Sequence, residues 1–100
     1  MKIPVQFITP QEWQQMSDIP GIVLIDLRSP QEYQKKHIPG AINIPYHMLR
    51  KIAPYRRNKI VLYCESGIRS TAAAMYLADR GYRTATLKGG IEAYSKAQTT

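Results

Sequence analysis

The chain has 100 residues, of which 44% are hydrophobic and 21% are charged, and its formal net charge is +7. This length and balance exclude two independent cores and extensive disorder, so we expect one globular domain over residues 1–100. Its longest purely aliphatic run, residues 22–25, is far shorter than the about 20 apolar residues of a membrane-spanning helix. No signal-peptide pattern opens the chain. We therefore expect a cytoplasmic protein that does not bind membranes.

Short aliphatic runs alternate with helical segments along the chain, which predicts an α/β domain with a parallel sheet. We expect strands at five places: residues 5–8, 22–25, 41–43, 60–63 and 84–87. We expect helices between and after them: residues 10–16, 30–36, 46–52, 70–80 and 91–96. The unbroken apolar character of residues 22–25 and 60–63 is typical of strands covered on both faces.

Several helix ends have recognisable local chemistry. Thr9 and Ser29 are each followed by proline and then, at the third position, by glutamate, so both predict a capping box. Pro54 bounds the third helix. Gly81 is placed to adopt the left-handed conformation that closes the alanine-rich helix.

The positive charge is concentrated in the middle of the chain. No acidic residue lies between Tyr33 and Cys64, whereas lysine and arginine occur seven times there. Such a segment attracts small anionic substrates, an acidic partner or RNA, and it is equally compatible with a solvated basic surface that has no dedicated partner. We do not expect nucleic acid as a partner, because no stacking-aromatic motif accompanies the basic residues.

Cys64 is the only cysteine, so an internal disulfide is excluded and its thiol is free. Only His37 and His47 could join it as strong metal ligands, and no CxxC or HxxxH spacing gathers them. We therefore expect no metal at this site.

The segment after Cys64 points to chemistry. Cys64 follows the predicted strand 60–63, at the sheet edge where open α/β domains bind ligands, and a turn containing Gly67 leads into the helix at about Ser70. Backbone N–H groups in such a turn lack helical partners and favour an anion, here the reactive thiolate. A buried packing cysteine is the alternative, but packing alone does not require Gly67 and Arg69 after it.

Three blocks of the sequence together resemble the rhodanese-like family. Residues 22–45, IVLIDLRSPQEYQKKHIPGAINIP, are similar to its first motif, and residues 64–70, CESGIRS, are similar to its active-site loop. Residues 87–94, LKGGIEAY, are similar to its closing block, with Tyr94 where tryptophan is common. The blocks stand in the family's order over nearly the whole chain.

The resemblance implies a three-layer α/β/α fold around a central five-stranded parallel sheet. It also implies a sulfurtransferase that moves sulfane sulfur from a small anionic donor such as thiosulfate to cyanide, a thiol or a protein acceptor. Cys64 carries the sulfur as a covalent persulfide, and no separate cofactor is needed. The substrate-binding residues that the resemblance implies are those of the loop: Glu65, Ser66, Gly67, Ile68, Arg69 and Ser70.

Other polar residues near the predicted site receive more modest roles. Asp26 and Arg28 follow a strand at the same sheet edge, and we expect them to support the site as an ion pair rather than to react. We expect His37 to stabilise its turn, because attack by a thiolate needs no general base. Glu65, acidic at the mouth of the site, repels a dianion and so argues against thiosulfate as the natural donor.

Two other functions fit parts of this pattern. A cysteine phosphatase or arsenate reductase shares the nucleophile, the amide loop and the arginine, but that pattern has five residues between cysteine and arginine, whereas four lie between Cys64 and Arg69. A non-enzymatic or sulfur-relay interaction module is the second alternative, and an intact Cys64, Gly67 and Arg69 argue against a degenerate site.

Overall fold

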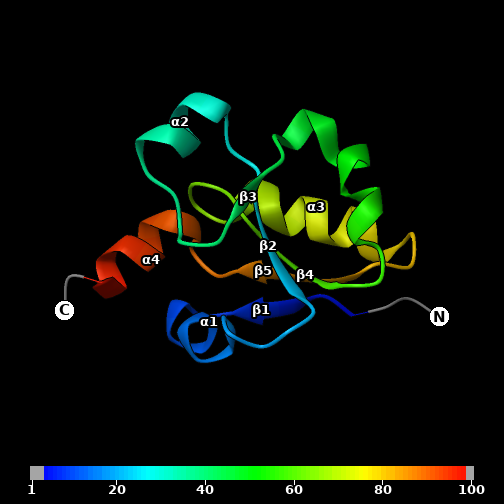
Figure 1. The fold of residues 1–100 in the computed structure, drawn as a ribbon, viewed down its shortest axis with the longest axis horizontal. Helices are drawn as coiled ribbons and strands as arrows, with labels where there is room; N and C mark the ends of the chain where they lie inside the picture. Colours follow the sequence, from blue (N-terminus) through cyan, green and yellow to red (C-terminus); the bar gives the residue numbers. More distant parts are fainter. Residues whose placement is uncertain (1–3, 99–100) are drawn as a thin grey trace.

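The computed structural model describes residues 4–98, which form five strands in one sheet, flanked by helices (Figure 1). The strands are β1 (Gln6–Ile8), β2 (Ile22–Asp26), β3 (Ile42–Asn43), β4 (Lys59–Tyr63) and β5 (Arg83–Leu87). The helices are α1 (Pro10–Met16), α2 (Pro30–Lys35), the 3-10 helix η1 (Tyr46–Tyr55), α3 (Ile68–Ala78) and α4 (Gly90–Gln98). Within residues 4–98, no helix has the length and apolar character that crossing a membrane requires.

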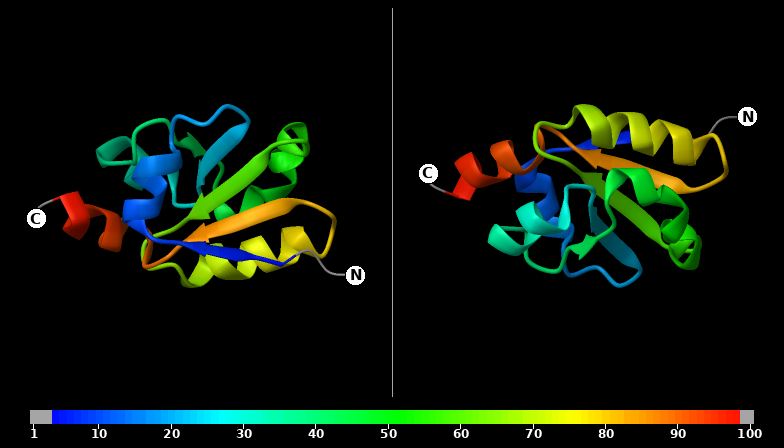
Figure 2. Two further views of the ribbon diagram at one scale, coloured as in Figure 1. Left: turned by 90° about the horizontal axis from the view of Figure 1, so that it is seen from below. Right: turned by 90° about the horizontal axis from the view of Figure 1, so that it is seen from above.

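All neighbouring strands are parallel, in the order β1-β5-β4-β2-β3 (Figure 2). The register between the two most apolar strands pairs Leu24 with Val61 and Ile25 with Leu62. Because the carboxyl ends of parallel strands share one edge of a sheet, this order puts the residue after β4 at the middle of that edge.

Successive residues of β4 are buried against opposite helical layers. Val61 and Tyr63 pack with residues of α1 and α4, whereas Ile60 and Leu62 pack with α3 and η1, and all four side chains are 0% exposed. This alternation explains why a strand with no polar residue between positions 60 and 63 is stable in the centre of the sheet. The three-layer α/β/α fold and the five-stranded parallel sheet are therefore confirmed.

The predicted helix caps are present. The hydroxyl groups of Thr9 and Ser29 accept the backbone N–H groups of Glu12 and Glu32, and each glutamate side chain accepts the N–H of its cap residue. Gly81 adopts the left-handed conformation with φ of 92°. The amide of the following residue, Tyr82, donates to the Leu77 carbonyl and closes α3.

Several helix boundaries differ from the sequence prediction by one to three residues. α3 begins at Ile68 rather than Ser70, because Gly67 ends the preceding turn in a left-handed conformation (φ 101°) and serves as the cap residue. The segment from Tyr46 is a 3-10 helix interrupted at Met48 (φ −115°, ψ 30°), and it continues through Pro54 instead of ending before it. Proline is tolerated there because a short 3-10 turn depends little on any one N–H donor.

Candidate active site

Cys64 lies directly after β4, at the centre of the carboxyl edge of the sheet. Its side chain is 5% exposed and lines a pocket of about 690 Å³. The turn that follows is closed by Gly67, and a β-carbon at that position would lie 3.2 Å from the Gly89 backbone nitrogen. The tight turn therefore requires glycine both for its φ angle and for the approach of the neighbouring loop.

Two backbone amides are directed at the Cys64 sulfur. The N–H groups of Gly67 and Ser70 donate to Sγ at 3.2 and 3.3 Å, and Sγ itself donates to the Ser70 hydroxyl oxygen at 3.5 Å. Both amides belong to the start of α3, where the helix dipole is positive. A cysteine that only fills space does not require two backbone donors directed at its sulfur.

Because α3 begins two residues earlier than predicted, Ser70 lies in its first turn and directs its N–H at the sulfur. The Ser70 side chain is 0% exposed and held by two contacts. Its Oγ donates to the Gly67 carbonyl at 3.2 Å and lies 2.7 Å from Thr86 Oγ1 on β5. Sequence reasoning missed Thr86. The sequence feature that could have indicated its role is the pair of threonines, Thr84 and Thr86, which lie two residues apart in an otherwise apolar strand.

The start of α4 holds the loop from the other side. The amides of Ile91 and Glu92 donate to the carbonyls of Cys64 and Glu65 at 3.0 and 3.1 Å. In a planar trans peptide the N–H points opposite to the C=O, so the amides of Glu65 and Ser66 point away from α4. Gly90 permits this approach, since a β-carbon there would lie 2.5 Å from the Cys64 carbonyl oxygen. Sequence reasoning identified this region as a helix start and as the closing block of the family resemblance, but not its contact with the loop after Cys64.

Predicted loop residues line the mouth of the pocket. Glu65, Ser66, Ile68 and Arg69 form one side, and the remaining wall comes from α2, η1 and the segments before them: Leu27, Arg28, Ser29, Pro30, Glu32, Pro45, Tyr46 and His47. The Arg69 guanidinium lies 5.8 Å from the Tyr46 ring centroid and is exposed. The structure therefore places Arg69 in the wall of the pocket, with its side chain exposed to solvent.

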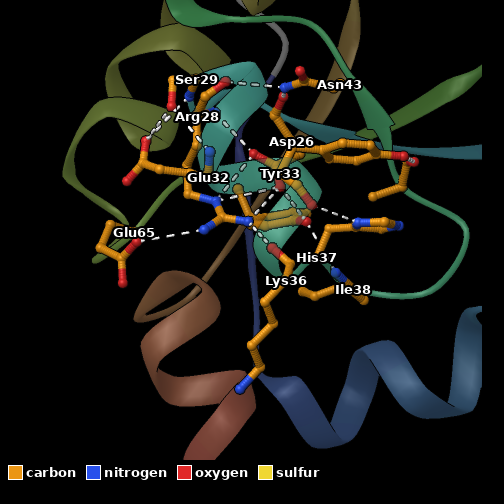
Figure 3. A network of polar contacts seen from close by, with 12 residues as sticks. Asp26, Arg28, Ser29, Glu32, Tyr33, Lys36, His37, Ile38, Asn43 and Glu65 are labelled. Carbon is orange, nitrogen blue, oxygen red and sulfur yellow. Dashed lines mark hydrogen bonds and ion pairs between the residues drawn. The ribbon is translucent and has the colours of Figure 1, made fainter.

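Asp26 is the centre of a buried polar network behind this wall (Figure 3). Its carboxylate is 0% exposed and accepts hydrogen bonds from the Arg28 amide at 2.8 Å, from Arg28 Nη2 at 2.9 Å and from the Tyr63 hydroxyl at 2.5 Å. The Tyr63 hydroxyl in turn accepts the Ile38 N–H at 3.1 Å. Asp26 thus does not reach the pocket, while its partner Arg28 does.

Arg28 connects this network to the loop after β4. Its Nη1 lies 3.6 Å from Glu65 Oε1, and its Nη2 also donates to the Lys36 carbonyl at 2.5 Å (Figure 3). Burial disfavours the charged guanidinium, but hydrogen bonds and charge from Asp26 outweigh burial and raise the pKa of Arg28. Arg28 is therefore a fixed positive charge that holds the Glu65 carboxylate at the mouth.

The other predicted polar residue, His37, lies outside this pocket. Its ring stacks on Tyr33 with centroids 3.8 Å apart, and Nδ1 lies 2.8 Å from the Tyr33 carbonyl oxygen. These contacts fit the predicted role in the turn. Within residues 4–98, no group of three or more His, Cys, Asp or Glu side chains is arranged to hold a metal ion, so no residue of the site is assigned as a metal ligand.

Known proteins resemble this chain over most of its length. The family model described as Rhodanese-like domain matches residues 9–97. A sulfurtransferase of Allochromatium vinosum is 37% identical over 90 residues, which cover 83% of this chain and 80% of that protein. A tRNA uridine(34) hydroxylase of Synechococcus elongatus is 32% identical over 99 residues, covering 90% of this chain but only 37% of that protein.

A solved structure gives a similar result for the fold. It is a protein of unknown function from Rhodopseudomonas palustris, described as a possible tyrosine phosphatase. The two structures superpose with a TM-score of 0.85 at 27% identity, covering 94% of this chain and 82% of the other. The fold is thus shared with proteins to which different chemistries have been ascribed, so the site must decide the function.

Proposed function

Since the chain belongs to the family of rhodanese-like domains, we propose that it is a sulfurtransferase that carries sulfur as a persulfide on Cys64. The observation that carries the proposal is the pair of amides, from Gly67 and Ser70, directed at one sulfur at the end of the central strand. The similarity to a sulfurtransferase supports the reaction class.

In the first step the Cys64 thiolate attacks the sulfane sulfur of the donor. A sulfur–sulfur bond to Cys64 forms, the donor's own bond to that sulfur breaks, and the leaving group departs with the electron pair; from thiosulfate this group is sulfite. The amides at the start of α3 stabilise the attacking thiolate, and the outward-facing amides of Glu65 and Ser66 offer donors to the terminal sulfur of the persulfide.

In the second step a nucleophilic acceptor, cyanide or a thiolate, attacks the terminal sulfur. The bond between that sulfur and Cys64 breaks, and Cys64 leaves as a thiolate, so neither step needs a general base. Arg69 at the rim interacts with anionic groups of the donor, and Asp26 acts only through Arg28, which positions Glu65.

The phosphatase alternative is tested against this proposal in the same protein. Four residues lie between Cys64 and Arg69, which closes a loop sized for one sulfur atom rather than for a phosphate group. We expect thiocyanate to form from thiosulfate and cyanide faster than an aryl phosphate is hydrolysed, and Cys64→Ser to abolish thiocyanate formation while the circular dichroism spectrum is unchanged.

Two results would contradict the assignment. If phosphate ester hydrolysis exceeds sulfur transfer, the site is that of a phosphatase. If the Cys64→Ser variant transfers sulfur at the wild-type rate, Cys64 is not the nucleophile. A folded wild-type protein that performs neither reaction with any sulfane donor would instead support a non-enzymatic interaction module.

A further inference from the structure

A second groove, of about 830 Å³, lies between η1 and α3, which are in contact above the sheet (Figure 1). Tyr46 and His47 line both this groove and the pocket of Cys64. The two hollows therefore lie next to each other, and a molecule held in the groove lies beside the proposed sulfur-transfer site.

Arginine dominates the charge of the groove. Arg50, Arg56 and Arg80 line it, and the lining contains no acidic residue among those that the structure describes. Two of these side chains are held in place. Arg56 Nη2 donates to the Arg80 carbonyl at 2.8 Å, and Arg80 Nη1 donates to the Tyr76 carbonyl at 3.0 Å. Guanidinium groups fixed in this way lose little conformational freedom when they bind a carboxylate.

An apolar stripe leads from the Cys64 pocket to the groove along α3. Ile68, at the pocket mouth, is 78% exposed, and Met75 and Tyr76 are 56% and 49% exposed. Their spacing of seven and eight residues places them on one face of the helix. A protein partner buries such a surface, whereas a small anionic substrate does not.

The same groove is poorly suited to RNA. Single-stranded nucleic acid binds to aromatic rings with a free face. Here the Arg80 guanidinium occupies one face of the Tyr76 ring at 3.5 Å from its centroid and leaves only the other face for stacking. The Arg56 guanidinium lies 4.6 Å from the centroid of the Tyr82 ring, and Tyr82 is only 8% exposed. Fixed arginines beside an apolar stripe instead complement carboxylates that flank an apolar side chain.

We propose that the groove between η1 and α3 docks an acidic segment of the protein that delivers sulfur to Cys64 or removes it. The proposal rests on the sulfur transfer proposed above. Because Tyr46 and His47 border both the groove and the pocket, a cysteine next to the acidic segment can reach the Cys64 sulfur while the segment stays bound. The basic middle of the chain thereby selects a protein partner.

The first test measures docking without sulfur chemistry. The probe is a labelled peptide rich in glutamate, with one leucine and a serine in place of cysteine, and its comparison peptide has glutamine at every glutamate. We expect the wild type to bind the acidic peptide more tightly in fluorescence anisotropy. The double variant Arg56→Gln/Arg80→Gln should bind it about three- to tenfold more weakly.

The double variant Arg57→Gln/Arg83→Gln is the matched control. It removes the same charge outside the groove and also removes one guanidinium-to-carbonyl bond, from Arg83 Nη2 to the Arg57 carbonyl. We expect it to bind like the wild type. Arg50→Glu, a change at an exposed side chain, should weaken binding even if the Arg56 and Arg80 changes disturb the fold.

The second test uses the cysteine form of each peptide as acceptor of sulfur from persulfidated protein. We expect faster transfer to the acidic peptide, loss of that preference in Arg56→Gln/Arg80→Gln, and unchanged transfer to cyanide. Docking would be overturned if the two double variants weakened peptide binding equally, or if the wild type did not prefer the acidic peptide. It would also be overturned if a single-stranded RNA oligonucleotide bound more tightly than the acidic peptide. Acidic-peptide binding by a protein that never forms a persulfide would overturn the sulfur-transfer function instead.

Discussion

At the scale of single residues, we propose that Glu65 influences which sulfur donors reach Cys64. Its side chain is 56% exposed, lies at the mouth of the pocket and is held there by Arg28 at 3.6 Å. A dianion such as thiosulfate must pass this carboxylate before it meets the loop amides. Arg28 offsets part of the negative charge of Glu65. We expect the negative charge that is not offset to disfavour doubly charged donors.

Replacing Glu65 by glutamine should therefore favour thiosulfate. We expect Glu65→Gln to raise the second-order rate of Cys64 persulfidation by thiosulfate about three- to tenfold at low salt, with a smaller gain at high salt. Stopped reactions analysed by intact mass measure this rate. Asp18→Asn, an exposed residue outside the pocket, removes the same charge and should leave the rate unchanged. A slower or unaltered Glu65→Gln would mean that the carboxylate does not repel the donor.

Tyr63 makes the buried network sensitive to alkaline pH. Burial, followed by its hydrogen bond to the Asp26 carboxylate, raises the pKa of Tyr63. The group is therefore neutral in the folded protein at pH values where it ionises in the unfolded chain. Its contribution to stability is fully present below the ordinary tyrosine pKa of about 10 and is lost as the pH rises toward the raised folded value.

The Tyr63→Phe variant tests this account. We expect it to lower the free energy of unfolding at neutral pH by about 1–3 kcal/mol, because Asp26 loses a donor and the Ile38 amide loses its acceptor. The decline in stability above pH 10 should also be shallower than in the wild type. Urea titrations across this range measure both effects. Tyr76→Phe, at a half-exposed position, should retain the wild-type profile, and a Tyr63→Phe profile as steep as the wild type would refute the linkage.

At the scale of elements, the contact between α4 and the loop after β4 fixes the site. Gly90 has a φ of 63°, and a β-carbon there would lie 2.5 Å from the Cys64 carbonyl oxygen. We expect Gly90→Ala to lower the free energy of unfolding by at least about 2 kcal/mol and to slow persulfidation, because the loop must move. Denaturant titration and loading kinetics measure the two effects.

Gly40→Ala is the control that separates backbone strain from the steric clash of a β-carbon at position 90 with the Cys64 carbonyl oxygen. Gly40 has a φ of 86°, and a β-carbon there would have no neighbour within 4 Å. We expect this strain alone to lower the free energy of unfolding by about 1–2 kcal/mol, with no change in the rate of persulfidation. Equal effects of the two substitutions on loading would show that the α4 contact does not position the loop.

Elements with local determinants were predictable from the sequence. Thr9 and Ser29 begin α1 and α2 through caps that close within four residues, and each strand was placed to within one residue at either end. The helix predicted over residues 46–52 is present as the 3-10 helix η1, but its predicted end was wrong. Pro54 was interpreted as the residue that ends this helix. In a 3-10 helix, however, one proline removes only a single backbone hydrogen-bond donor, and η1 continues past Pro54 to Tyr55.

At the scale of the whole molecule, the sequence predicted the strand–turn–helix unit that contains Cys64 and the ion pair of Asp26 with Arg28, but not the contacts that join distant elements around them. Cys64, Gly67 and Ser70 are close in the chain, so their meeting follows from one strand–turn–helix unit. The contacts of Asp26 with Tyr63 and of Ser70 with Thr86 join residues on different strands and helices. No local pattern fixes such pairs, because sheet order and register bring them together.

Persulfide formation on Cys64 is the claim on which the rest of this account depends, and intact-protein mass spectrometry measures it directly. After incubation with a sulfane donor and removal of excess reagent, we expect the mass to rise by one sulfur atom. A thiol reductant should reverse the gain, and Cys64→Ser should not show it. Two results would contradict this claim. One is a wild-type mass that does not change with thiosulfate or with a less charged persulfide donor, and the other is a Cys64→Ser variant that gains the same sulfur.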